Sequence, residues 1–131
     1  MIISPAQRTR ALYAWENLLE VCPGNGNIGS RYAQRMTRDI YWRYAVSRPA
    51  PKIEFRCAGV PYAEGYGLIV LTDLNCREST AVHEITHARG FGTARNPHSA
   101  SFCKAYIDAL AWWFSWEWEP LYMDAKLIGL L

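Results

Sequence analysis

The sequence has few histidines, few charged residues and no long apolar run. The last of these shortages argues against a membrane-spanning protein. Only three of the 131 residues are histidines, and 20% are charged. No apolar stretch approaches the ~20 residues that cross a bilayer, so we expect no membrane-spanning helix. Half of the residues are nonetheless hydrophobic and 14% are aromatic, which suits a packed core and argues against a disordered chain. The length predicts a single domain spanning residues 1–131.

Secretory and zinc-knuckle patterns are also missing. Arg8 and Arg10 interrupt the N-terminal region where a secretory signal would need its apolar stretch. No two cysteines form a C-x-x-C pair, which argues against a structural zinc knuckle. We therefore expect a cytoplasmic protein whose cysteines are free thiols, mostly buried, although their even number would permit two disulfides. The cysteines are Cys22, Cys57, Cys76 and Cys103.

The positive charges gather in the first half of the chain. Residues 1–57 hold nine Arg and Lys against four Asp and Glu, whereas residues 58–131 hold five against eight. Arg31, Arg35 and Arg38 would share one helix face, and such a stripe can contact nucleic-acid phosphates. Three charges are more ordinarily a solvated helix face, so nucleic acid is only a secondary expectation.

Helical periodicity alternates with short β-favouring runs, which predicts an α+β fold with helices packed on a small antiparallel or mixed sheet. Ser4 followed by Pro5 has the pattern of a helix start. Asn75, three residues before Glu78, has the spacing of a capping box. Helices are expected at residues 5–21, 30–46, 76–89, 97–119 and 121–130, and strands at 52–57 and 66–71.

The most specific pattern is the run His83-Glu84-Ile85-Thr86-His87 in the helix expected at residues 76–89. Residues four apart lie one turn apart on the same helix face, so His83 and His87 can both reach one metal ion. Glu84 can then act as general base on a water molecule, whose pKa Zn²⁺ lowers toward ~7. Two ordinary histidines bonded to backbone or water are the alternative interpretation.

A catalytic zinc site of this kind needs a third protein ligand. His98 is the one remaining histidine, and it lies eleven positions after His87 at the expected start of the next helix. A glycine-containing loop can turn that helix start toward the metal. The alternatives are a carboxylate on the following helix, with Asp108 and Glu117 as candidates, and for His98 itself a role as a polar residue near a helix start.

These residues resemble the SprT-like zinc metallopeptidases, in which an HExxH helix follows a strand and a third histidine opens the next helix. The likeness lies in Leu68-Ile-Val-Leu, Arg77, HEITH and the run from Pro97 to Phe102. It implies a zincin-like fold, zinc ligands at His83, His87 and His98, and a catalytic Glu84. The chain is also similar to small HExxH metallohydrolases of actinobacteria and their phages. The resemblance covers about residues 66–113, and Ser99-Ala100 replace the usual Gly-Pro.

The pattern therefore predicts a zinc metallopeptidase that cleaves a peptide or protein substrate. Zinc and Glu84 would activate water for attack on a carbonyl, and Glu84 would pass the proton to the leaving amine. The strand before the motif helix would offer its edge to an extended substrate. One tyrosine among Tyr62, Tyr66 and Tyr106 could polarise the carbonyl, although each of these is individually more typical of packing.

Two other functions fit the same residues. The chain could be a non-catalytic zinc-binding adaptor that docks a partner through its Trp-rich C-terminal region, because the helical phases of those rings differ and cannot all face one core. It could also be a regulatory peptidase that cuts one repressor-like protein. The ordinary interpretation of the aromatic set is core packing with a partly exposed patch; its members are Trp112, Trp113, Phe114, Trp116 and Trp118.

Overall fold

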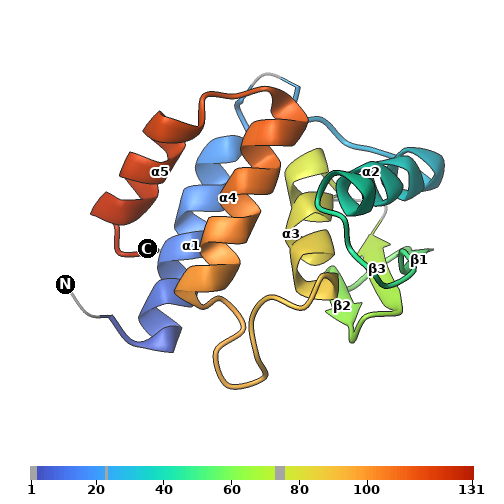
Figure 1. The fold of residues 1–131 in the computed structure, drawn as a ribbon, viewed down its shortest axis with the longest axis horizontal. Helices are drawn as coiled ribbons and strands as arrows, with labels where there is room; N and C mark the ends of the chain where they lie inside the picture. Colours follow the sequence, from blue (N-terminus) through green and yellow to red (C-terminus); the bar gives the residue numbers. More distant parts are fainter. Residues whose placement is uncertain (1–2, 23, 73–75) are drawn as a thin grey trace. The chain divides into compact units, whose positions relative to one another are not determined.

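A computed structural model of the chain describes residues 3–22, 24–72 and 76–131 (Figure 1). The described residues form five helices and three strands, which confirms the expected α+β class. The chain divides into two compact units, one made of Met1–Gly24 with Phe91–Leu131 and the other of Asn25–Gly90. The two units are described in turn, and the single domain expected from chain length stays a prediction.

The unit of residues 25–90 is built on a small mixed sheet. Its strands are β1 (Lys52–Arg56), β2 (Tyr62–Glu64) and β3 (Leu68–Thr72), in the order β1-β3-β2. β1 runs parallel to β3, and β2 runs antiparallel to it. The mixed sheet agrees with the expectation, and both predicted strands lie within about two residues of their observed positions.

Two features of this sheet differ from the sequence expectations. β2 was not expected, because three residues between Pro61 and Gly65 are too short for a clear alternating pattern. β3, the strand before the motif helix, is central and pairs on both sides. It therefore has no edge to offer a substrate, and that part of the prediction is wrong. Among the described strands, the free edges belong to β1 and β2.

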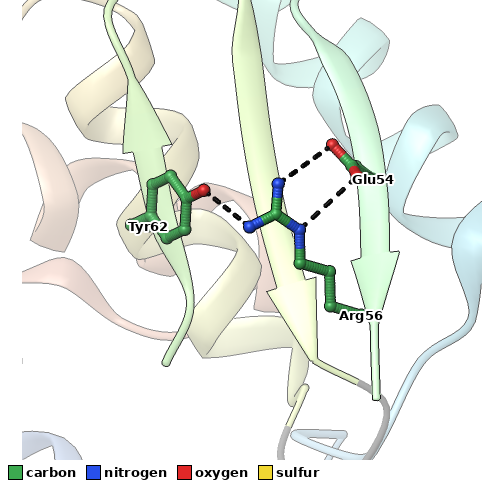
Figure 2. Close-up of polar contacts among 3 residues, drawn as sticks. All are labelled: Glu54, Arg56 and Tyr62. Carbon is green, nitrogen blue, oxygen red and sulfur yellow. Dashed lines mark hydrogen bonds and ion pairs between the residues drawn. The ribbon is translucent and has the colours of Figure 1, made fainter. Parts of the chain in front are cut away.

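A cross-strand cluster covers the outer face of the sheet. Figure 2 shows the Arg56 side chain reaching across β3, from β1 to Tyr62 on β2. The Arg56 guanidinium donates to the Tyr62 hydroxyl at 2.9 Å and to the Glu54 carboxylate at 3.4 and 3.5 Å. Val70 lies opposite both Glu54 and Tyr62 in the register and is only 1% exposed. Because long charged side chains can cover apolar surface with their aliphatic stems, this cluster shields the central strand from water.

The other face of the sheet packs against two helices, α2 (Ser30–Arg43) and α3 (Glu78–Ala88). Ile69 and Leu71 are fully buried on this face. α2 contacts β1 and α3, while α3 contacts β2 and β3. Nine of the eleven α3 residues are buried, so this helix is a rigid support for the side chains that it carries.

The N-terminus of α3 is capped from a distant part of the chain. Its own N-cap residue, Arg77, makes no side-chain cap. Instead the buried Asn25 side chain accepts a hydrogen bond from the Ser79 backbone N–H at 3.0 Å and donates to the Ser79 hydroxyl at 2.9 Å. The Gly26 carbonyl accepts from the Glu78 N–H at 3.0 Å. The helix was expected to begin at residue 76 with Asn75 as its cap; it begins at Glu78, and Asn75 lies outside the described residues.

Replacing Asn25 by alanine is expected to lower the free energy of unfolding by about 1–3 kcal/mol, because the substitution leaves two buried polar groups of Ser79 without their partner. Asn27→Ala is the matched control, since Asn27 is exposed and should change stability by no more than about 0.5 kcal/mol. Urea denaturation followed by circular dichroism measures both variants. Equal stability of the two variants would contradict a capping role for Asn25.

The unit of residues 1–24 and 91–131 consists of α1 (Pro5–Leu19), α4 (Ala100–Phe114) and α5 (Trp118–Leu127). α1 starts where the Ser4-Pro5 pattern predicted, and the structure adds a capping box between Ser4 and Gln7. α1 and α4 run side by side in Figure 1. The buried Tyr106 of α4 donates a hydrogen bond to the Glu16 carboxylate at 3.0 Å and meets the Trp15 ring edge to face.

The last two helices are divided differently from the sequence expectation. α4 was expected to run from residue 97 to about 119, but it starts at Ala100 under a Ser99 cap and ends at Phe114. Ser115 adopts a left-handed conformation with φ 56°, which terminates the helix. Pro120 lies in the first turn of α5, where the missing proline N–H breaks no helical hydrogen bond.

The tryptophans at the end of α4 do not build the core. Trp112 and Trp118 are 38% and 39% exposed, and Trp113 and Trp116 are only partly buried. Their rings stack in neighbouring pairs, such as Trp118 on Tyr122 at 4.4 Å between centroids. The expected partly exposed patch is therefore present, whereas the core of this unit is formed by other residues: Leu12, Trp15, Leu19, Phe102, Tyr106, Ile107 and Leu110.

Two expectations from composition can be compared with the described residues. Of their helices, none combines the length and the apolar character that crossing a bilayer requires. All four cysteines are free; Cys76 and Cys103 are buried, Cys22 is partly buried and Cys57 is exposed. Burial raises the pKa of the Cys103 thiol to about 12. The cysteines are thus free as expected, but only two of them are buried.

Candidate metal centre

The motif residues lie on α3 as the sequence predicted. His83 and His87 occupy successive turns, and their ring centroids are 5.0 Å apart. His83 is 5% exposed and His87 is partly buried. Glu84, beside the first histidine, is 6% exposed. A carboxylate placed in such a protected position, next to two imidazoles, has the surroundings of a functional group.

The C-terminus of α3 is closed immediately after His87. The Gly90 N–H donates to the His87 carbonyl at 2.9 Å, and Arg48 donates to the Arg89 carbonyl at 2.8 Å. Gly90 has φ 103°, a conformation that favours glycine. An added Cβ would also approach the Arg48 guanidinium at 3.1 Å and the Tyr66 ring at 3.3 Å. Gly90 therefore closes the helix within one turn of the second histidine, and the helix ends at Ala88, one residue before the predicted end at residue 89.

A tight loop precedes His98 in the other unit. Gly92 has φ 83°, and a Cβ added to it would lie 2.1 Å from the Pro97 carbonyl oxygen. Between them, the Thr93 N–H donates to the Asn96 carbonyl at 3.1 Å, and the Asn96 N–H donates to the Thr93 hydroxyl at 3.0 Å. This close approach of the backbone to itself requires glycine at position 92. The loop fixes the backbone immediately before His98.

The His98 ring is held by side chains of α1 and α4. Its Nδ1 lies 3.0 Å from the Thr9 hydroxyl oxygen. Tyr13 and Phe102 meet the ring edge to face, with centroids at 5.5 and 5.1 Å. His98 is 5% exposed. Because Thr9 engages Nδ1, a metal held by this ring would be bound through Nε2.

Among the described residues, His83, His87 and His98 form a group that could hold a metal ion: the ring nitrogens that they offer all lie within 4.8 Å of one another. The two carboxylates considered as alternative third ligands are not part of this group. Asp108 accepts a hydrogen bond from the Trp118 indole N–H, and Glu117 is exposed at the start of α5.

The donor set fits a divalent transition metal. Imidazole nitrogen suits zinc, copper and nickel, whereas calcium and magnesium prefer oxygen ligands. Two nitrogens that share one Zn²⁺ lie at most about 4.2 Å apart, and the nitrogens of this group lie within 4.8 Å of one another. Three histidines also leave the fourth position of a tetrahedral ion open, which is the arrangement of catalytic rather than structural zinc sites.

Thr9→Val is expected to weaken zinc binding by about 10- to 100-fold, because valine keeps the shape of threonine but removes the hydroxyl that orients the His98 ring. Thr9→Ser keeps the hydroxyl and should retain most of the affinity. Competition with a chromogenic chelator measures zinc affinity directly, without an activity assay. If the valine and serine variants bind zinc equally well, the Thr9 hydroxyl does not orient the ring.

The three candidate tyrosines have distinct surroundings. Tyr106 is fully buried and bonded to Glu16, and the Tyr62 hydroxyl accepts from Arg56, so both have structural roles. The Tyr66 ring lies under the Arg48 guanidinium, 3.8 Å from its centroid. Within the described part of the chain, the Tyr66 hydroxyl makes no hydrogen bond, so its O–H is available to polarise a carbonyl.

Thr9 and Tyr13 were not foreseen as part of this centre. They are four residues apart on α1 and thus share its face, but nothing in the sequence links that face to a histidine 89 positions after Thr9. No protein-family model, curated protein or solved structure matches the chain significantly, so its function is inferred from its own residues.

Proposed function

We propose that the chain is a zinc-dependent hydrolase, most simply a metallopeptidase, with His83, His87 and His98 as metal ligands and Glu84 as general base. The observation that carries this proposal is the histidine group itself, whose nitrogens lie within 4.8 Å of one another. A carboxylate follows the first of these histidines on the same buried helix. If His83 and His87 had no metal role, nothing would require His98, the third histidine of the sequence, to belong to the same group.

The residue types indicate which step of the proposed reaction each group would perform. Zinc, when bound, supplies a Lewis acid that polarises a carbonyl oxygen and brings the ionisation of water close to neutral pH. Glu84 accepts the proton of the attacking water and returns it to the leaving amine. The buried α3 backbone holds Glu84 in place during both transfers, because this helix packs against β2, β3 and α2.

The substrate backbone would bind along β2 rather than β3. β2 is an edge strand that also contacts α3, the helix of the motif. An extended peptide can add to such an edge through main-chain hydrogen bonds, with alternate side chains facing opposite sides. A substrate bound in this way would be recognised mainly by its backbone and by an unfolded or flexible conformation around the cleaved bond.

The proposal is tested by metal content and peptide cleavage. Elemental analysis of purified protein for zinc, copper, nickel, cobalt and iron should find about one zinc per chain. Incubation with a mixture of unstructured peptides should yield new termini, detected by mass spectrometry. A chelator should stop cleavage, and added zinc should restore it. Stoichiometric zinc without any cleavage would contradict the enzymatic part while leaving the metal centre in place.

The alternative function is a zinc-binding adaptor that docks a protein partner. The observation in its favour is the partly exposed tryptophan patch, where Trp112 and Trp118 are 38% and 39% exposed. Such rings are enriched at protein interfaces. Trp112→Ala would then abolish partner binding with zinc content unchanged, whereas a peptidase would keep cleaving short peptides after the same substitution.

A further inference from the structure

A polar pocket of about 410 Å³ lies where α2 meets the start of β1. It lies within the unit of residues 25–90, and it contains none of the three histidines. Volumes of this order accommodate small organic ligands. The pocket is lined by Gln34, Arg38, Ala50, Pro51, Lys52 and Ile53.

The lining carries two positive charges and no negative charge. Among the described residues, neither the Arg38 guanidinium nor the Lys52 ammonium forms an ion pair or side-chain hydrogen bond. Asp39, the acidic residue adjacent to Arg38 in sequence, instead lies 3.8 Å from the Arg35 guanidinium. Residues 28–52 hold six Arg and Lys and only one acidic residue, so the pocket lies in a positive field that would attract anions.

The remaining lining is suited to the uncharged part of a ligand. Pro51 is buried and Ile53 partly buried, and with Ala50 they form an apolar wall. The Gln34 amide N–H donates to the Ser30 hydroxyl at 3.3 Å, which leaves its carbonyl oxygen and a second N–H for a ligand. The pocket thus combines a cationic part with an apolar wall.

We propose that this pocket binds a small organic phosphate, with the phosphate between Arg38 and Lys52 and the organic group against Pro51 and Ile53. A phosphate monoester carries about −1.5 to −2 charges at neutral pH, which matches the two cations of the lining. The guanidinium can donate two parallel hydrogen bonds to phosphate oxygens, and the ammonium contributes a compact charge. This site is separate from the proposed zinc centre and does not depend on it.

The test is a titration of the isotope-labelled, zinc-loaded protein with phenyl phosphate, followed by nuclear magnetic resonance. Saturable shifts of the backbone amides of Gln34, Arg38 and Ile53 are expected, with a dissociation constant of about 0.1–1 mM. Arg38→Gln and Lys52→Gln should each weaken binding at least about tenfold, since each removes charged hydrogen bonds. Inorganic phosphate should bind more weakly than phenyl phosphate because it lacks the apolar group.

Arg31→Gln is the matched control, because Arg31 is an exposed arginine of the same helix that does not line the pocket. It should change the dissociation constant by less than about twofold. Weakening as large as that of Arg38→Gln would overturn the proposal in favour of a diffuse charge effect. Three other results would also overturn it: no saturable shifts, shifts confined to His83 and His87, or a DNA duplex that binds while phenyl phosphate does not.

Discussion

Replacing Glu84 by glutamine is expected to slow peptide cleavage by about 10²- to 10⁴-fold while the protein keeps its zinc. Glutamine has nearly the same size as glutamate, so the buried position on α3 can accept it without a change in packing. It cannot accept a proton from the attacking water, and general-base catalysis contributes roughly 10²- to 10⁴-fold to the rate. The turnover number should fall by that factor, whereas zinc content by elemental analysis should stay at that of the unaltered protein.

Glu78→Gln is the matched control, since Glu78 is a second buried glutamate on the same helix. The Tyr32 hydroxyl donates a hydrogen bond to the Glu78 carboxylate, and this bond, together with burial, raises the pKa of Tyr32 to about 12. In the control the Tyr32 pKa should move back toward 10, as an alkaline absorbance titration would show, with turnover retained. If both glutamine variants lose turnover equally, negative charge on α3 matters and proton transfer by Glu84 does not.

Replacing His98 by alanine is expected to weaken zinc binding by more than about 100-fold. Mutation of a residue that merely orients a zinc ligand costs about 10- to 100-fold in affinity, so removal of the ligand itself should cost more. The affected nitrogen belongs to the group whose members lie within 4.8 Å of one another. Competition with a chromogenic chelator measures the affinity, and circular dichroism checks that the helices remain.

Asp108→Asn and Glu117→Gln are the controls for this experiment, because these carboxylates were the other candidates for the third ligand. Asp108 accepts from the Trp118 indole, and Glu117 is exposed, so neither substitution should change zinc affinity. Zinc loss in Asp108→Asn together with normal binding in His98→Ala would reverse the assignment of the third ligand.

Features that depend on residues close in sequence were predictable. The two histidines of α3 are four residues apart, and the helix that carries them ends at Ala88, one residue before the predicted end. The start of α1 also follows from neighbouring residues, Ser4 and Pro5. The mixed α+β architecture followed from the alternation of helical and strand periodicities. In each case the residues that determine the feature are close together in the sequence, so the pattern that they form can be recognised without the structure.

Features that depend on residues far apart were not predictable. Asn25 caps α3 from 54 positions away, and Thr9 contacts His98 across 89 positions. A single asparagine or threonine carries no sign of such a partner, because either residue is equally suited to a local turn or helix cap. β2 was missed for another reason: three residues gain their strand conformation from pairing with β3 rather than from their own propensity.

The close approach of Gly92 to the Pro97 carbonyl restricts which residues position 92 can accept. A library that randomises residues 91–97 and is selected only for zinc binding should return glycine at position 92 almost without exception, because every other side chain would force the backbone before His98 apart. Position 92 would thus score with the proposed metal ligands in such a selection, although glycine has no side chain that could bind zinc.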